Sequence, residues 1–268
     1  MAETNIHPTA IVEDGATLAD GVSIGPFSVV GREVTLGEGV VLHSHAVVAG
    51  RTTIGARTEI FPFASIGHKP QDLKYKGEAS TLTIGTDCMI REGVTINPGT
   101  EGGGMTTTVG NGCAFLANSH VGHDCHVGNN VIFSNNVMLA GHVEVGDFAI
   151  IGGGAAVIQF ARVGDHAFLG GMSGLEQDLI PYGMALGNRA YLSGLNIIGL
   201  KRRGFSASQI HDLRRAYRLL FAAEGTLLER VDDVAEEFRD HPTVMEIIAF
   251  IRAGGKRSMC TPKNAADA

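Results

Sequence analysis

Three histidines and a carboxylate lie within seven residues of this chain, at His120, His123, Asp124 and His126. Imidazole titrates near neutral pH, so it can take a proton from a hydroxyl or an amine under physiological conditions. Imidazole nitrogens are also common ligands of zinc. The segment is therefore the strongest candidate for chemistry in the sequence, either as a general base or as part of a metal site.

The histidines lie inside a long six-residue repeat that has to position them. An aliphatic or aromatic residue recurs at every sixth position from Ile6 to Ile66 and, after two interruptions, from Val109 to Leu175. A strict period of six drifts around a helix of 3.6 residues per turn, but it fits short strands separated by tight turns. Each strand would turn one apolar residue inward, and the glycines that often follow, such as Gly25, would ease the corners. Stacked coils then bury ladders of equivalent positions, as in other solenoids.

The period is that of the hexapeptide-repeat parallel β-helix, whose members form a three-sided, left-handed prism with three hexads per coil. Residues 18 apart in the sequence then lie one above the other. Gly141 is 18 residues after His123, and His142 is 18 residues after Asp124. We therefore expect Gly141-His142 to stack directly on His123-Asp124.

Two functions fit such a stack. In the first, His123 is a general base, Asp124 orients its ring, and the Gly141 N–H stabilises an oxyanion. In the second, a zinc ion activates water. Its ligands would be the histidines of the cluster, namely His120, His123 and either His142 or His126. Because His126 has no evident partner at its stacked positions, we expect it to be a surface residue.

The first interruption of the repeat, residues 68–83, is polar and contains the run Gln71-Asp72-Leu73-Lys74-Tyr75. Insertions in repeat proteins commonly map to a binding face. This loop is therefore either a ligand-binding segment or a surface insertion without a function, and the two alternatives are equally reasonable. The interval from Ile66 to Ile84 is 18 residues, and we expect this loop to replace part of one coil.

The second interruption, residues 97–108, is rich in glycine. Ile96 and Val109 are 13 residues apart, which equals two hexads and one extra residue, so we expect a second loop to be extruded there. No phosphate-binding glycine motif opens a helix here, so we interpret the segment as a flexible loop.

The repeat fades after Leu175 and helical patterns follow. Capping-box signals at Ser206 and Thr226, together with Pro242, predict three short amphipathic helices that end near Arg252. We expect a β-helix domain over residues 1–187, an α-helical domain over residues 188–268, and a disordered tail after Gly255. The basic run Lys201-Arg202-Arg203 is either a solvated flank, a diphosphate site or a docking site for an acidic protein.

The bulk composition excludes several classes of protein. The chain has 268 residues, of which 28 are acidic and 21 basic, for a net charge of −7, which disfavours general binding of nucleic acid or anionic membranes. Neither a signal peptide nor a membrane-spanning apolar run is present, so we expect a cytoplasmic protein. The four cysteines match no zinc pattern, and we interpret them as buried or incidental thiols.

The motifs, taken in order, resemble the UDP-N-acetylglucosamine O-acyltransferase family of Gram-negative bacteria, which begins lipid A synthesis. The resemblance spans nearly the whole chain. It depends on Gln71-Asp72-Leu73-Lys74-Tyr75, His120-x-x-His123-Asp124-Cys125, Ala140-Gly141-His142-Val143, Gly187-Asn188 and Gly199-Leu200-Lys201-Arg202-Arg203-Gly204-Phe205-Ser206.

The resemblance implies an (R)-3-hydroxyacyl donor on acyl carrier protein and the glucosamine 3-hydroxyl of UDP-N-acetylglucosamine as the acceptor. It implies no cofactor and no metal. His123 matches the general base, with support from Asp124, and Gly141 matches the oxyanion donor. Residues that match substrate contacts are Gln71, Asp72, Lys74, His120, His142, Gln159, Asn196, Arg202 and Arg203.

The family is a homotrimer with sites between subunits, which would let Asp72 and Lys74 reach a neighbour's His123. Gly171 falls where the family sets acyl length, and a glycine there predicts a longer chain.

Four residues depart from the family pattern. Ile158 stands in place of a histidine, Asn97-Pro98 in place of a His-Arg pair, and Ile198 in place of a glutamate. These departures leave a 3-amino sugar nucleotide open as the acceptor. A zinc carbonic anhydrase of the same fold is the rival with different chemistry, and a scaffold without chemistry is the non-enzyme rival.

Overall fold

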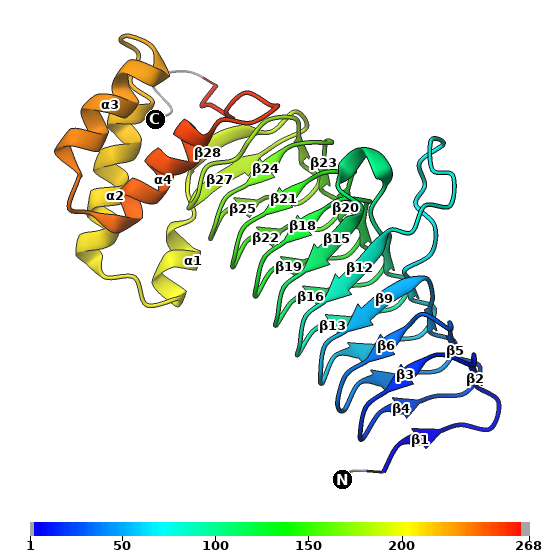
Figure 1. The fold of residues 1–268 in the computed structure, drawn as a ribbon. Helices are drawn as coiled ribbons and strands as arrows, with labels where there is room; N and C mark the ends of the chain where they lie inside the picture. Colours follow the sequence, from blue (N-terminus) through cyan, green and yellow to red (C-terminus); the bar gives the residue numbers. More distant parts are fainter. Residues whose placement is uncertain (1–2, 264–268) are drawn as a thin grey trace.

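The computed structural model describes residues 3–263, which form a three-sided prism of short strands followed by a group of helices (Figure 1). The coils stack in one direction from the N-terminus, and the helices lie at the far end of the stack (Figure 1). The predicted class, a left-handed parallel β-helix with a C-terminal helical bundle, is confirmed. No helix among residues 3–263 has the length and apolar character needed to cross a membrane.

The three faces of the prism are three sheets, here called sheets A, B and C, whose strands run parallel except for β28 at the end of sheet A. Sheet A contains β1 (Asn5–Ile6), β4 (Ser23–Ile24), β7 (Val41–Leu42), β10 (Glu59–Ile60), β13 (Met89–Ile90), β16 (Ala114–Phe115), β19 (Ile132–Phe133), β22 (Ile150–Ile151), β25 (Phe168–Leu169), β27 (Gly183–Leu186) and β28 (Tyr191–Leu195). Sheet B contains β2 (Ile11–Val12), β5 (Val29–Val30), β8 (Val47–Val48), β11 (Ser65–Ile66), β14 (Thr95–Ile96), β17 (His120–Val121), β20 (Met138–Leu139), β23 (Ala156–Val157) and β26 (Gly174–Leu175). Sheet C contains β3 (Thr17–Leu18), β6 (Thr35–Leu36), β9 (Arg51–Ile54), β12 (Thr81–Ile84), β15 (Thr106–Val109), β18 (His126–Val127), β21 (Glu144–Val145) and β24 (Arg162–Val163).

The sixth-position residues form the core. From Ile24 to Leu175 each of them is buried, whereas Ile6 in the first coil remains 43% exposed because no coil lies beneath it. Neighbouring strands pair in register across the stack, as Val121 does with Leu139, 18 residues later. Each coil therefore buries its apolar residues only by stacking on its neighbours, which is the energetic logic of a solenoid.

The corners depart from the sequence-based expectation about glycine. At most corners the left-handed backbone conformation falls on the third residue after the core residue, and non-glycine residues commonly occupy it, including Phe27, Asp124 and His142 with φ of 59°, 58° and 62°. A glycine directly after the core residue has a different purpose. A Cβ at Gly25 would lie 2.9 Å from the backbone of His43, so glycine there permits close approach of successive coils.

Corner side chains stack along the prism. His166 lies between Phe148 and Tyr182, with ring centroids 4.8 Å and 5.5 Å away and nearly parallel planes. Burial, with a smaller contribution from the positive charge of Arg203, lowers the pKa of His166 to about 4. The stack thus holds a histidine that resists protonation.

Both interruptions are insertions at a single corner, the one between sheets B and C. Ile66 pairs with Ile96 and Ile84 pairs with Ile54, so the expectation that the first loop replaces part of a coil was wrong. The second loop also leaves from sheet B and returns to sheet C, at β15, so it is extruded from the prism at the same corner. The expectation for the first loop failed because spacing alone does not tell an insertion from an omitted strand.

The helical region begins later than predicted, because β27 and β28 form an antiparallel hairpin on sheet A. We therefore propose a domain boundary at Asn196 in place of 187/188. Four helices follow: α1 (Ile197–Arg202), α2 (Ala207–Leu220), α3 (Leu227–Glu237) and α4 (Pro242–Ala253). Both predicted capping boxes are present, at the starts of α2 and α3, whereas α1 was not predicted.

The segment after α4 is ordered as far as it is described, in contrast to the expected disordered tail. Its backbone bonds to the end of the prism, with the amide of Cys260 2.8 Å from the carbonyl oxygen of Asp178 and the carbonyl of Thr261 3.0 Å from the amide of Leu192. Residues 264–268 lie outside the described residues. All four cysteines are buried and free, as expected.

Candidate active site

His123 occupies the corner that follows β17. Its Nδ1 lies 2.7 Å from Oδ2 of Asp124, and its side chain is 11% exposed. A carboxylate at this distance holds the proton on Nδ1 and leaves the lone pair of Nε2 available for an incoming proton. The Nε2 atom faces the first loop, where Oδ2 of Asp72 lies 4.0 Å away. This Asp72 belongs to the same chain as His123. The expected contact of Asp72 with the His123 of a neighbouring subunit is therefore not required to bring the two side chains together.

Asp124 is held by the second loop, which is ordered and not the flexible loop expected from its glycines. Thr100 donates to the carboxylate twice, from its amide to Oδ1 at 2.8 Å and from its hydroxyl to Oδ2 at 2.6 Å. A Cβ on Gly103 would lie 2.0 Å from Cγ of Asp124, so glycine is required where the loop crosses. Sequence reasoning missed Thr100, because nothing in the glycine pattern indicated where the loop would fold.

Gly141 and His142 occupy the same corner one coil later, as the 18-residue spacing predicted. The His142 amide donates to the carbonyl oxygen of His123 at 2.9 Å. A Cβ on Gly141 would lie 2.5 Å from Cε1 of His123, so only glycine leaves room for the ring. Among the residues that the structure describes, no hydrogen-bond acceptor is found for the Gly141 amide. An amide in this position can donate to an oxyanion beside the imidazole.

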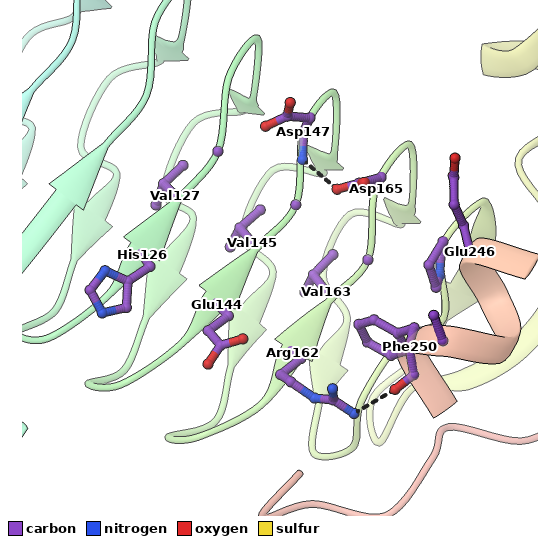
Figure 2. A pocket seen from close by; sticks show the side chains of 15 residues that line it. His126, Val127, Glu144, Val145, Asp147, Arg162, Val163, Asp165, Glu246 and Phe250 are labelled. Atoms are coloured by element: carbon purple, nitrogen blue, oxygen red, sulfur yellow. Dashed lines mark hydrogen bonds between the residues drawn. The ribbon is translucent and has the colours of Figure 1, made fainter. Parts of the chain in front are cut away.

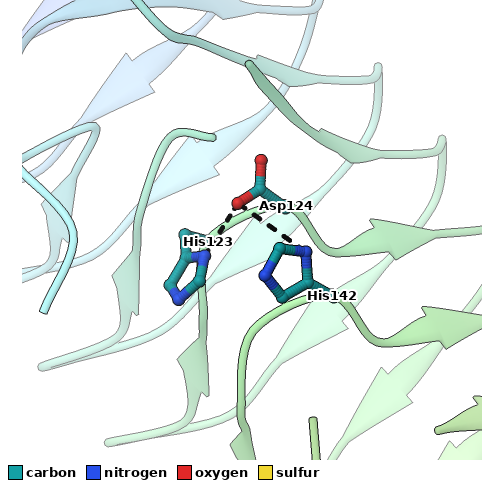
Figure 3. Close-up of side chains that lie close together, drawn as sticks. All are labelled: His123, Asp124 and His142. Atoms are coloured by element: carbon teal, nitrogen blue, oxygen red, sulfur yellow. Dashed lines mark hydrogen bonds and ion pairs between the residues drawn. The ribbon is translucent and has the colours of Figure 1, made fainter. Parts of the chain in front are cut away.

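The His142 ring completes the group. It lies edge-on to His123, with centroids 4.9 Å apart at 86°, and stacks on Phe160 at 4.4 Å and 12°. Figure 3 shows both imidazoles directed toward the Asp124 carboxylate, which lies 3.9 Å from Nδ1 of His142. Burial, the largest influence, lowers the pKa of His142, so the ring is more often neutral at physiological pH.

A cavity of about 480 Å³ opens beside this corner on the face of sheet B. Its walls include His120, Gln71 and Gln159 together with His123 and Gly141. His120 is fixed by Thr95, whose Oγ1 lies 2.7 Å from Nδ1, and burial followed by the nearby charge of His123 lowers the pKa of His120. The cavity thus joins residues from four coils and one loop around the His123 ring.

Other predicted residues lie on different corners of the prism. Asn196 caps α1 by accepting from the Gly199 amide at 3.1 Å and donates to the His166 carbonyl at 2.9 Å. Arg203 donates to the Phe148 carbonyl at 2.6 Å. Both therefore lie at the corner between sheets C and A, whereas His123 lies between sheets B and C. Within one chain the structure does not bring them together with His123.

The remaining predicted residues are exposed. Arg202, Lys74, Gly171 and Gln159 all have solvent-accessible side chains or backbone. His126 is exposed too, as predicted, but it does have a stacked partner, since its Nδ1 lies 2.9 Å from Oγ1 of Thr108.

The residues that depart from the family pattern occupy varied settings. Asn97 is buried and links the two loops, because its Nδ2 donates to the His68 carbonyl at 3.1 Å. Pro98 is buried beside it, Ile158 is half-buried against the core, and Ile198 is 68% exposed on α1.

One group in the described part of the chain could hold a metal ion. His123, Asp124 and His142 each offer an atom within 4.8 Å of the others. The zinc set considered from the sequence is not this one, since His120 and His126 do not join it. Nδ1 of His123 and Oδ2 of Asp124 are already hydrogen-bonded to each other at 2.7 Å, and the Thr100 hydroxyl donates to the same Oδ2. This arrangement serves a proton acceptor better than it serves a tetrahedral ion.

A second, larger cavity of about 760 Å³ lies between α4 and the face of sheet C (Figure 2). Its labelled walls include Asp147, Asp165, Glu246 and Phe250. The Asp165 carboxylate accepts from the backbone amide of Asp147 at 2.7 Å, so it supports the corner of the coil below. Of the residues predicted to act in chemistry, His126, the alternative zinc ligand, lines this cavity, whereas the residues of the His123 corner do not.

Fold and site together define a transferase of the hexapeptide-repeat class. Residues 106–141, which include His123 and Gly141, match the family model described as bacterial transferase hexapeptide. Residues 178–260 match the model described as UDP-N-acetylglucosamine O-acyltransferase, domain 2.

Similar proteins extend this likeness to the whole chain. The acyl-[acyl-carrier-protein]–UDP-N-acetylglucosamine O-acyltransferase of Methylobacterium radiotolerans is 73% identical over 98% of this chain and 97% of its own. Its namesake from Brucella ovis is 50% identical over 98% and 94%. The solved structure of the Francisella novicida UDP-N-acetylglucosamine acyltransferase is 34% identical, covers 98% of this chain and 96% of its own, and has a TM-score of 0.94. The chain belongs to the UDP-N-acetylglucosamine O-acyltransferase family.

Proposed function

We propose that the chain transfers an (R)-3-hydroxyacyl group from acyl carrier protein to the glucosamine 3-hydroxyl of UDP-N-acetylglucosamine, the first step of lipid A synthesis. The relatives from Methylobacterium radiotolerans and Brucella ovis bear the name of this reaction. The observation that carries the proposal is the stacked pair at one corner. A proton acceptor, His123, lies under a backbone donor, Gly141, with one cavity in front of both.

The reaction uses that pair directly. Nε2 of His123 accepts the proton of the sugar hydroxyl as its oxygen attacks the thioester carbonyl carbon. The carbonyl oxygen becomes an oxyanion that the Gly141 amide stabilises, and Asp124 stabilises the imidazolium from the other side. The carbon–sulfur bond then breaks, and the leaving thiolate takes the proton from Nε2. The sequence of steps balances without a metal or a cofactor.

The acceptor sugar would lie in the cavity on the face of sheet B. Asp72, whose Oδ2 lies 4.0 Å from Nε2 of His123, would bind the sugar near the reacting hydroxyl, and Lys74 belongs to the same loop. The proposed acceptor contacts are Gln71, Asp72, Lys74, His120, His142 and Gln159. Both imidazoles in this set have a lowered pKa, so they would meet the sugar as neutral hydrogen-bonding groups.

Binding of the nucleotide part of the acceptor would require residues of a second subunit. Asn196, Arg202 and Arg203, the proposed nucleotide contacts, lie near a corner that does not contain His123. A homotrimer with sites between subunits would bring that corner of one chain toward the His123 corner of the next.

Exposed apolar side chains support such an assembly. Leu73, at the tip of the first loop, is fully exposed, and Met172 is 78% exposed at the corner between sheets A and B. The same corner and its flanking faces expose further apolar residues, namely Phe27, Phe63, Met89, Ile132 and Met138. Sheet C instead presents polar residues such as Thr35 and Glu144. Burial of an apolar edge of this kind is what a permanent oligomer needs.

The acyl chain would run along the prism toward Gly171, where a glycine leaves space for a long chain. This corner also exposes Met172, and a Cβ at Gly171 would meet only the Gly153 backbone, at 3.2 Å. Acyl carrier protein would deliver the chain in the cytoplasm of a Gram-negative bacterium.

The test is an acyl-transfer assay with purified protein, a panel of acyl carrier protein thioesters and two acceptors, UDP-N-acetylglucosamine and its 3-amino analogue. We expect transfer to the 3-hydroxyl with long 3-hydroxyacyl donors. The 3-amino acceptor is the second candidate, which Ile158 and Ile198 motivate, and a clear preference for it would change the acceptor assignment. Bicarbonate formation that a chelator abolishes would replace the proposal with zinc hydration.

A further inference from the structure

The segment after α4 returns to the prism and crosses close to the active-site corner. This segment, residues 254–261, is here called the C-terminal strap. Its backbone forms two hydrogen bonds with the backbone of Asp178. The Asp178 amide donates to the carbonyl of Ser258 at 2.9 Å, and the Asp178 carbonyl accepts from the Cys260 amide at 2.8 Å. Asp178 in turn forms an ion pair with Arg162 at 2.8 Å, and its own side chain is fully buried. The strap is thus held by buried groups at the last coils of the prism.

Two cations of the strap contact the corner that follows β23. Nε of Arg257 donates to the carbonyl oxygen of Gln159 at 2.9 Å. Nζ of Lys256 lies 4.0 Å from the ring centroid of Phe160. Gln159 lines the cavity in front of His123. The Phe160 ring stacks on the His142 ring, with the two centroids 4.4 Å apart.

We propose that the C-terminal strap sets the acceptor-binding geometry of the site, with Arg257 and Lys256 as positioning residues. Arg257 fixes the backbone of the corner that presents Gln159 to the sugar. Lys256 fixes Phe160 and, through the stacked rings, the orientation of His142. The inference rests on the acyl transfer proposed above and adds that acceptor recognition depends on residues that follow the last helix.

The charge on Lys256 has a second consequence. The ionisable groups that face His142 are Asp124 and His123 on the coil below, Asp72 on the first loop, and Lys256 on the strap. Burial lowers the pKa of His142 most, and the positive charge of Lys256 lowers it further. Removing that charge raises the pKa of His142, so the ring becomes protonated at a higher pH.

The first test compares Arg257→Ala with Arg257→Lys, and it uses Arg252→Ala as the matched control, since Arg252 pairs with Asp232 on the surface of the helical domain. Loss of a charge-assisted hydrogen bond predicts a rise of about tenfold in the KM for UDP-N-acetylglucosamine in Arg257→Ala. The KM for the acyl donor and the Tm should stay unchanged, and Arg257→Lys should recover most of the loss.

Two results would overturn the inference. One is an acceptor KM in Arg257→Ala equal to that of Arg252→Ala. The other is an equal rise in both KM values together with a lower Tm, which would indicate a purely structural role. If the wild-type protein fails to acylate UDP-N-acetylglucosamine at all, the proposed function fails first and the two failures are told apart.

The second test is Lys256→Met, which keeps the apolar stem over Phe160 and removes the charge. We expect the acid limb of the pH profile of kcat/KM for the acceptor to move to higher pH, because the pKa of His142 rises. Arg257→Ala should leave that limb in place. Superimposable profiles for wild type and Lys256→Met would refute the assigned role of Lys256.

Discussion

Gly141→Ala tests the stacked corner, because it adds one methyl group between two successive coils. The new Cβ would lie 2.5 Å from Cε1 and 2.6 Å from Nε2 of His123. An ordinary carbon–carbon contact is about 3.5 Å, so the imidazole has to withdraw by about 1 Å. The backbone of Gly141 is not left-handed, so alanine can adopt the same backbone conformation and the amide donor is retained. The substitution therefore displaces the base without removing any catalytic group.

A displacement of about 1 Å in a reacting group lowers the rate by about 100-fold, which equals about 2.7 kcal/mol of transition-state stabilisation. We expect kcat/KM of Gly141→Ala to fall by this factor in an initial-rate assay with the acyl donor and UDP-N-acetylglucosamine. The Tm should change little, since the His123 ring lies outside the buried ladder of core residues.

Gly174→Ala is the matched control, because its Cβ would meet the nearest atom, the amide nitrogen of Arg189, at an ordinary 3.7 Å. It should retain nearly all the wild-type activity. Gly141→Ala with an unchanged kcat/KM would contradict the proposed place of His123 under Gly141. An equal loss in Gly174→Ala would show that the effect is not specific to the corner.

Three further predictions concern other parts of the site and the fold. Lys74→Ala should raise the KM for UDP-N-acetylglucosamine with little effect on the donor, and an unchanged acceptor KM in steady-state kinetics would count against the sugar-nucleotide contact. Gly171→Met should shift the preferred acyl chain to a shorter length in a competition among donors, and unaltered selectivity would dismiss the glycine as the length determinant. His166 has a folded pKa of about 4 against an ordinary 6.5, so the unfolded state takes up a proton first and stability is lost as the pH falls from about 6.5 toward 4. His166→Phe keeps the ring stack and should lose less Tm than wild type between neutral and acidic pH, whereas equal losses would assign the acid sensitivity to other groups.

The regular part of the molecule could be predicted from the sequence. A strict period of six allows only stacked short strands, and the 18-residue coil then places Gly141 over His123 by arithmetic alone. The helices were predictable for a similar reason, since the signals at Ser206 and Thr226 are local and both capping boxes formed.

The irregular parts could not be predicted, because their positions depend on contacts between distant segments. Spacing could not show that both loops leave from the corner that carries His123. Nor could it show that Thr100 donates twice to Asp124 or that Arg257 returns to Gln159 from a position 98 residues later. Asn196 and Arg203 matched a family motif, but only the structure shows that they lie on another corner of the same chain.

The most direct measurement of the central claim is the kcat of His123→Ala beside wild type, with an acyl carrier protein thioester and UDP-N-acetylglucosamine as substrates. Loss of a general base lowers the rate by about 10²–10⁴-fold, and we expect at least the lower figure with an unchanged Tm. A folded His123→Ala protein that turns over at a rate near that of wild type would show that the imidazole over which Gly141 lies is not the base.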